Sequence, residues 1–137
     1  MGAKMSVEST VQNQVLLTGS QFGMLLQRNN NGACIDETGR LIRYGLMNES
    51  KKVNQEIKSS DLIGITPVQI TGHMVGRTVG IYTALECKET GWKMRPSDDR
   101  AKAQLKYIEL VRSYGGIAGF CSDPAHIQTL FIDWLKR

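Results

Sequence analysis

The stretch from residue 61 to residue 88, DLIGITPVQITGHMVGRTVGIYTALECK, constrains the fold of this chain more than any other part. It contains two apolar runs rich in β-branched residues, and a glycine-containing turn around residues 72–76 joins them. This pattern predicts a β-hairpin with long antiparallel strands. Because side chains alternate along a strand, Glu86 and Lys88 point to the same face. The start of the first strand lies beside the end of the second in such a hairpin, so we expect Asp61 close to Glu86.

The rest of the chain supplies helices and shorter strands. The pattern predicts a helix over residues 6–18 with Ser6 as N-cap and Gly19 as its end, a hairpin that turns at residues 36–39, and a loop over residues 48–60. Residues 98–114 predict a further helix, GGIAGFCS a short buried strand, and DPAHIQTLFIDWL a closing helix. Together these elements predict an α/β or α+β fold over one domain, residues 1–137, in which helices flank a central mixed sheet that contains the long hairpin.

The composition is that of an ordinary globular domain, with 41% hydrophobic and 22% charged residues. No apolar run approaches the roughly 18 residues of a spanning helix, and the N-terminus lacks the layout of a signal peptide, so we expect a cytoplasmic protein. The cysteines, Cys34, Cys87 and Cys121, show neither CxxC nor histidine-rich spacing. This argues against a zinc cluster or a disulfide framework, and we expect reduced, buried thiols.

The net charge of +4 suits a polyanionic partner, and its distribution is more informative than its total. Between Lys88 and Arg112, seven basic residues oppose four acidic ones. The candidates for phosphate contact are Lys93, Arg95, Arg100, Lys102 and Lys106. A solvated helix face is the ordinary interpretation of such residues. Trp92, which lies among them, either stacks on a base or packs across the strand end.

Asp61 and Glu86, with Lys88 alongside, form the candidate catalytic group. Two carboxylates and a nearby backbone carbonyl offer the hard oxygen ligands that Mg²⁺ and Mn²⁺ prefer. A lysine beside such an ion orients a water molecule or neutralises charge that builds on phosphorus. The arrangement indicates metal-assisted hydrolysis of a phosphodiester. A lone Glu-x-Lys is more often a solvated strand end, and the pairing with Asp61 is what favours a site.

Two further polar residues are candidates for the same site. Gln104 falls on the helix face that turns towards the predicted sheet. Glu8 lies in the first turn of the first helix, where it either reaches the metal or complements the helix dipole. Taken alone, each is more often a boundary or exposed residue.

An ordered set of motifs covers nearly the whole chain. The motifs are ESTVQNQVLL at 8–17, QRNNNGAC at 27–34, GRLIRYGL at 39–46, SSDLIGITPV at 59–68, ALECKE at 84–89, Gln104, and GGIAGFCSD at 115–123. This set resembles the virus-type replication-repair nuclease (VRR-NUC) domain of the PD-(D/E)xK nuclease superfamily, in its compact stand-alone viral or bacterial form. The resemblance implies a restriction-endonuclease-like core.

The resemblance also implies roles for individual residues. Asp61 and Glu86 would bind the divalent metal, Mg²⁺ or Mn²⁺, with the backbone carbonyl of Cys87 as a further ligand. Lys88 would be the active-site lysine of the superfamily.

Other positions match the family pattern away from this core. Gln104 matches the glutamine on the helix that follows the lysine, and Glu8 matches an N-terminal acid that completes the site and is a further candidate metal ligand. Arg28, Asn29 and Arg43 match polar positions, for which the resemblance implies substrate contact or a role in shaping the site.

Stand-alone members of the family are similar in arrangement to Holliday-junction resolvases. This implies a homodimer that acts on branched DNA in replication, repair or recombination, inside a bacterial cell or a phage-infected host. The segments NESKKVNQEIK and GWKMRPSDDRAKA depart from the family pattern as insertions, where DNA shape would be read. Two alternatives remain. A non-catalytic DNA-binding module has no use for two carboxylates that face phosphate, whereas a structure-specific RNA nuclease would share every residue named.

Overall fold

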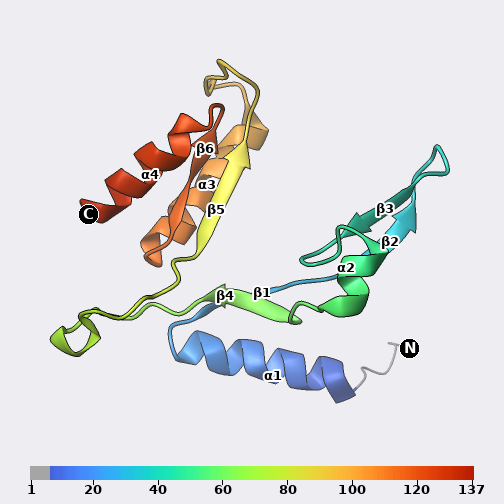
Figure 1. Ribbon diagram of the computed structural model, residues 1–137, viewed down its shortest axis with the longest axis horizontal. Helices are drawn as coiled ribbons and strands as arrows, with labels where there is room; N and C mark the ends of the chain where they lie inside the picture. The colour runs from blue at the N-terminus through green and yellow to red at the C-terminus, as the bar shows by residue number, and fades with distance from the viewer. Residues whose placement is uncertain (1–6) are drawn as a thin grey trace. The chain divides into compact units, whose positions relative to one another are not determined.

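The structure, a computed structural model, describes residues 7–137, and the chain divides after Gly64 into an N-terminal and a C-terminal unit (Figure 1). The elements up to the division are α1 (Val7–Gln21), β1 (Leu25–Arg28), β2 (Gly32–Ile35), β3 (Leu41–Tyr44), α2 (Lys51–Glu56) and β4 (Leu62–Ile65), which runs one residue past it. Those that follow are the 3-10 helix η1 (Gly72–Met74), β5 (Thr83–Cys87), α3 (Asp99–Ser113), β6 (Ile117–Cys121) and α4 (Ala125–Leu135).

The strands pair two by two, β1 with β4, β2 with β3 and β5 with β6. The mixed α/β class is therefore confirmed, although the described strands form three small sheets and not one central sheet. Ser6, the predicted N-cap of the first helix, lies outside the described residues. Among the helices that the structure describes, none has both the length and the apolar character needed to cross a membrane.

Helix α1 continues two residues beyond Gly19, where the sequence predicts its end. Gly19 is buried, and a Cβ at this position would meet the Leu26 side chain, so this glycine allows α1 to lie close to β1. The chain leaves the helix instead at Gly23, which has a left-handed φ of 79°. The Met24 N–H then donates to the Gly19 carbonyl at 2.9 Å, which satisfies a carbonyl at the end of the helix.

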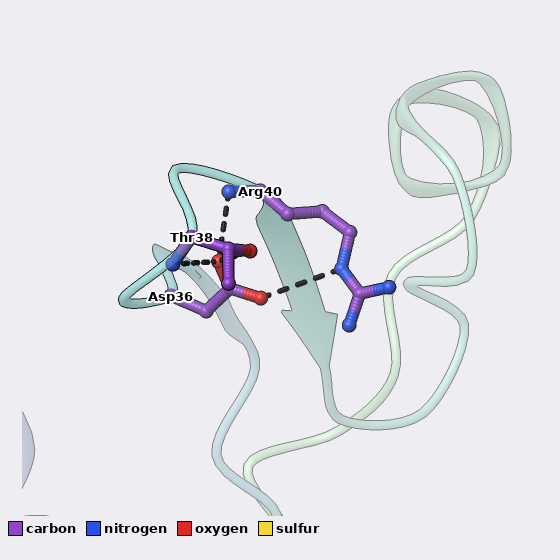
Figure 2. Close-up of polar contacts among 3 residues, drawn as sticks. All are labelled: Asp36, Thr38 and Arg40. Atoms are coloured by element: carbon purple, nitrogen blue, oxygen red, sulfur yellow. Dashed lines mark hydrogen bonds and ion pairs between the residues drawn. The ribbon is translucent and has the colours of Figure 1, made fainter.

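The carboxylate of Asp36 holds the turn of the β2–β3 hairpin (Figure 2). Its Oδ1 accepts hydrogen bonds from the Thr38 hydroxyl (2.6 Å), the Thr38 N–H (2.9 Å) and the Arg40 N–H (2.8 Å). Its Oδ2 lies 3.4 Å from the Arg40 guanidinium, and Gly39 takes the left-handed position with a φ of 82°. The predicted turn is confirmed. The Thr38 hydroxyl, and then the Arg40 N–H, hold the pKa of Asp36 below its ordinary value.

The predicted loop over residues 48–60 contains a short helix, α2. The Ser50 hydroxyl caps its start by accepting a hydrogen bond from the Val53 N–H at 3.2 Å. Near its end, Lys58 Nζ donates to the carbonyl of Asn54 at 2.7 Å. A helix of six residues is too short to display a hydrophobic period, which is why the pattern did not predict it.

The predicted antiparallel hairpin over residues 61–88 is wrong. Its first half, β4, pairs with β1, and its second half, β5, pairs with β6, while η1 lies between them in the chain. Pro67 supplies a physical reason, because it has no N–H to donate to a ladder and β4 ends two residues before it. Gly64 allows β4 to lie close to its partner β1, because a Cβ at this position would collide with the Leu25 carbonyl.

In the C-terminal unit, β5 and β6 run parallel and in register, and α3 connects them. Asp98 caps α3, because its Oδ1 accepts a hydrogen bond from the Ala101 N–H at 2.9 Å. Ala101, Ile108 and Val111 are buried along one side of this helix. The predicted helix over residues 98–114 is therefore confirmed.

The two long helices of this unit cover opposite faces of the β5–β6 sheet. Gln104 of α3 bonds to the Glu86 side chain, which places α3 over the face that carries Glu86. Gly119 of β6 lies opposite Leu85 and shares the other face, and a Cβ there would meet Leu130 of α4. The predicted short strand and closing helix are both present.

Candidate functional site

One cluster of three polar side chains joins β5 to α3, the Glu86–Gln104–Lys88 cluster. The amide of Gln104 donates through Nε2 to Glu86 Oε1 at 2.6 Å and accepts at Oε1 from Lys88 Nζ at 2.7 Å. Because an ammonium only donates and a carboxylate only accepts, the two charged partners fix the orientation of the amide between them. Three of the five predicted catalytic residues therefore meet through direct hydrogen bonds.

The spacing of both elements produces this cluster. Glu86 and Lys88 are half-buried, whereas Cys87 between them is exposed, so the predicted alternation is confirmed. Gln104 follows the buried Ala101 by three residues, which places it on the side of α3 that turns to the sheet. The hydrogen bonds join a neutral amide to charged groups, which explains their short lengths.

Two aromatic rings complete the surroundings of Lys88. Its Nζ lies 5.0 Å from the ring centre of Trp92 and 5.7 Å from that of Phe120. The two rings contact each other with their centres 4.7 Å apart. Cation–π attraction to both rings and the bond to Gln104 hold the ammonium in one place. Trp92 therefore packs across the strand end, one of its two predicted roles, and stacking on a base stays a prediction.

The backbone carbonyl of Cys87 points away from β6. The Tyr82 carbonyl accepts from the Ile117 N–H at 2.9 Å, and the Lys88 N–H donates to the Cys121 carbonyl at 2.8 Å. Because successive residues of a strand direct their backbone groups to alternate sides, the even-numbered residues of β5 face β6 and Cys87 faces the other edge. Within the described residues no strand pairs at that edge. A carboxylate and a carbonyl oxygen are donors that fit a hard divalent cation.

Hollows adjoin the cluster on the α3 side and beyond the end of β5. A cavity of about 590 Å³ is lined by Glu86 and Gln104 together with Arg100 and the tyrosines Tyr82 and Tyr107. A second cavity, of about 500 Å³, is lined by Trp92 with its neighbours Lys93 and Arg95. Three of the predicted phosphate-contacting residues therefore lie at hollows next to the cluster.

Asp61 lines a polar hollow of the N-terminal unit. This asparagine hollow has a volume of about 600 Å³, and its lining includes Asn29, Asn31, Arg43, Asn48, Lys58 and Asp61. The structure therefore brings together Asp61, Asn29 and Arg43, which the sequence predicted as site residues. Arg43 and Lys58 bring positive charge to the hollow, Asp61 brings a negative charge, and the asparagine amides bring both donors and acceptors.

Hydrogen bonds that Asn29 donates set the position of the chain at Asp61. The Asn29 N–H donates to the Asp61 carbonyl at 2.8 Å. The Asn29 amide nitrogen donates to the Ser59 hydroxyl at 2.8 Å and to the Ser60 carbonyl at 2.9 Å. Of the two roles that the resemblance implies for Asn29, these contacts support shaping the site.

Asn48, which was not among the predicted site residues, supports Arg43. Asn48 is 4% exposed, and its amide nitrogen donates to the carbonyls of Gly32 (2.7 Å) and Tyr44 (2.8 Å). Its Oδ1 accepts from Arg43 Nη1 at 3.3 Å. An asparagine that closes a glycine-containing turn, GLMN, was the available signal.

The remaining predicted residues are exposed or bond to other side chains of their own unit. Glu8 is exposed in the first turn of α1. Arg28 donates to Asn13 at 2.5 Å and to Gln12 at 3.4 Å, so its guanidinium faces α1. Lys102 and Lys106 are exposed on α3, and Lys102 lies 3.9 Å from Asp99.

The acidic side chains do not gather into a metal cluster within either unit. Across residues 7–137, no group of three or more histidine, cysteine, aspartate or glutamate side chains is arranged to hold a metal ion. Glu8 and Asp61 belong to the N-terminal unit, while Glu86 and Cys87 belong to the C-terminal unit. The predicted ligand set draws on both units, and it stays a prediction.

All three cysteines are less buried than the sequence predicted. Cys34 and Cys87 are exposed, and Cys121 is half-buried. Desolvation raises the pKa of the Cys121 thiol, with a smaller contribution from the neighbouring Cys87.

Comparisons of this chain with protein-family models, with curated proteins and with solved structures found no match. The resemblance to the VRR-NUC domain therefore rests on the motifs of the sequence.

Proposed function

We propose that this chain is a divalent-metal-dependent DNA endonuclease with the restriction-endonuclease-like core of the PD-(D/E)xK superfamily, similar to the VRR-NUC domain. The observation that carries the proposal is the hydrogen-bonded cluster in which Gln104 joins Glu86 to Lys88. The alternative, a solvated strand end, would leave the acid and the lysine in water. Here both are half-buried and share one amide.

The chemistry of the Glu86–Gln104–Lys88 cluster suits it to phosphodiester hydrolysis. Glu86 and the Cys87 carbonyl offer oxygen ligands to a metal ion. The resemblance assigns Asp61 to the same ion, with Glu8 as an additional acid. A bound Mg²⁺ or Mn²⁺ supplies Lewis-acid polarisation of the phosphate and lowers the pKa of an attacking water. Lys88 supplies a fixed positive charge that orients the water and stabilises the negative charge that develops on phosphate oxygens.

Gln104 acts as a positioning residue in this scheme. Its neutral amide lies between an acid and a base on the same face of β5, and it bonds to both. A neutral amide in this place bonds to both charged side chains and adds no charge of its own to the site. Glu86 uses one oxygen, Oε1, in this bond, and a carboxylate has acceptor capacity for several partners.

The basic residues near the cluster support a nucleic acid as substrate. Arg100 lines the cavity that contains Glu86 and Gln104, and Lys93 and Arg95 line the next one. Neutralising phosphates with such residues releases counterions, so binding should weaken steeply as salt rises. We propose branched DNA as the substrate class and a homodimer as the active form, both on the basis of the resemblance.

The proposal is tested by cleavage of a labelled four-way junction in Mg²⁺, in Mn²⁺ and in EDTA. Linear duplex, single-stranded DNA and a structured RNA serve as parallel substrates. The expected result is metal-dependent cutting of the junction in preference to the other three. Sedimentation of the protein with and without the junction determines whether a dimer is the active form.

Two variants separate catalysis from binding. Asp61→Asn and Glu86→Gln should abolish cleavage and keep or strengthen junction binding, because each removes a negative charge that faces the DNA backbone. Asp133→Asn is the matched control, since Asp133 is an exposed aspartate of α4. Cleavage that survives in Asp61→Asn would contradict the metal assignment. Tight binding without cutting in either metal would identify a non-catalytic DNA-binding module.

A further inference from the structure

Two of the three cysteines lie directly opposite each other on the parallel strands of the C-terminal unit. The register of β5 and β6 pairs Cys87 with Cys121. Paired residues of parallel strands point to the same face, so the two thiols share the face opposite Glu86 and Lys88. Neighbouring strands are about 4.8 Å apart, which is inside the range of Cα separations that a disulfide spans.

The backbone at this position is fixed. The Lys88 N–H donates to the Cys121 carbonyl at 2.8 Å, which extends the ladder one residue beyond the cysteine pair. Cys87 is exposed and Cys121 is half-buried. A small reagent therefore reaches the Cys87 thiol more easily than the Cys121 thiol. The third cysteine, Cys34, is exposed in the other unit, where it lies opposite Ile42.

We propose that Cys87 and Cys121 form a dithiol site that reacts with small-molecule disulfides of the glutathione class and closes to an intramolecular disulfide. The sulfur of Cys87, deprotonated, attacks one sulfur of oxidised glutathione, and the S–S bond breaks to release one glutathione thiolate. The sulfur of Cys121, deprotonated in turn, attacks the Cys87 sulfur of this mixed disulfide and releases the second. The two protein thiols lose two protons and two electrons, and glutathione disulfide is reduced to two molecules of glutathione.

The disulfide would join β5 to β6 beside the backbone of Lys88. It would also close a covalent loop that contains the whole of α3. The oxidised and reduced proteins would therefore differ at the strand that carries the Glu86–Gln104–Lys88 cluster. This inference rests on the strand register and on exposure, and it holds whether or not the chain is a nuclease.

The test is incubation of the folded protein with oxidised glutathione, followed by acid quenching, intact mass measurement and peptide mapping without reduction. The expected product has lost two hydrogen atoms and yields a peptide pair that links Cys87 to Cys121, with any glutathione adduct confined to Cys34. The Cys34→Ser variant should give the same cross-link. The Cys121→Ser variant should stop at one glutathione on Cys87, because the resolving thiol is absent.

A comparison with the protein unfolded in urea shows whether the fold is responsible. Because the folded strands hold the thiols side by side, cross-linking should be about tenfold or more faster in the folded protein. Equal rates in the two states would overturn the proposal. So would a stable glutathione adduct on Cys87 of the wild-type protein without a cross-link, or reaction at Cys34 alone.

Discussion

Replacing Gln104 by methionine removes both hydrogen bonds of the cluster and keeps the length and helix propensity of the side chain. A hydrogen bond to a charged group contributes about 1.5–3 kcal/mol when it is buried. The cluster is half-buried, so water replaces part of each lost bond. Glu86 and Lys88 also remain on one face of β5 with their Cα atoms about 6.6 Å apart, so their opposite charges still attract each other. We therefore expect a loss of about 1–2 kcal/mol in the free energy of unfolding of the C-terminal unit.

Tryptophan fluorescence during urea unfolding measures this loss selectively. The chain has two tryptophans, Trp92 and Trp134, and both belong to the C-terminal unit. Gln128→Met is the matched control, because Gln128 is an exposed glutamine of α4 and its replacement should change stability by less than about 0.5 kcal/mol. Equal stability of the two variants would refute the hydrogen-bonded cluster.

Two further predictions concern the N-terminal unit. The pKa of Asp36 is held below its ordinary value of 3.8, so its stabilising contribution is complete above about pH 4 and is lost as the pH falls through the lowered value. An NMR titration of the Asp36 carboxyl should give a pKa below 3.8, and an ordinary pKa would contradict the turn in Figure 2. Gly64→Ala should lower stability by about 1–3 kcal/mol, because its Cβ collides with the Leu25 carbonyl. Amide exchange in β1 measures this effect, and Gly72→Ala is the control, since a Cβ at Gly72 meets nothing within 4 Å. Unchanged exchange in Gly64→Ala would contradict the close approach of β1 and β4.

Local patterns determined how much of the fold the sequence predicted. The turn at Asp36 and Gly39 and the helix that starts at Asp98 depend on side chains a few residues apart, and both are confirmed. The helix predicted over residues 6–18 is present as α1, but Val7, Val11 and Val15, which recur along it at helical spacing, are 84%, 49% and 44% exposed. Periodicity therefore indicated the element without determining which surface it buries.

Strand pairing was harder to predict because it is not local. Two apolar runs joined by glycines favoured a hairpin over residues 61–88, yet each run pairs with a strand from another part of the chain. Pro67 was visible in the sequence, and its missing N–H argued against a long first strand.

The candidate site was predictable where it depended on periodicity and not where it depended on pairing. Alternation along β5 and helical spacing along α3 were enough to bring Glu86, Lys88 and Gln104 to one place. Phe120 was missed, because its contact with Lys88 depends on the parallel pairing of β5 with β6. Asn48 was missed because the turn GLMN marks it only as a turn residue, whereas its hydrogen bonds are to backbone carbonyls that the fold brings beside it.

The most direct measurement is single-turnover cleavage of a four-way junction by Lys88→Met in Mg²⁺. The control is Lys136→Met, since Lys136 is an exposed lysine beyond α4. The account predicts that Lys88→Met lowers the cleavage rate by about 10²–10³, because a fixed charge that stabilises the transition state is lost. It also predicts that Lys136→Met cuts at the wild-type rate and that EDTA abolishes cutting by both. A Lys88→Met variant that cuts as fast as Lys136→Met would contradict the central role of the cluster.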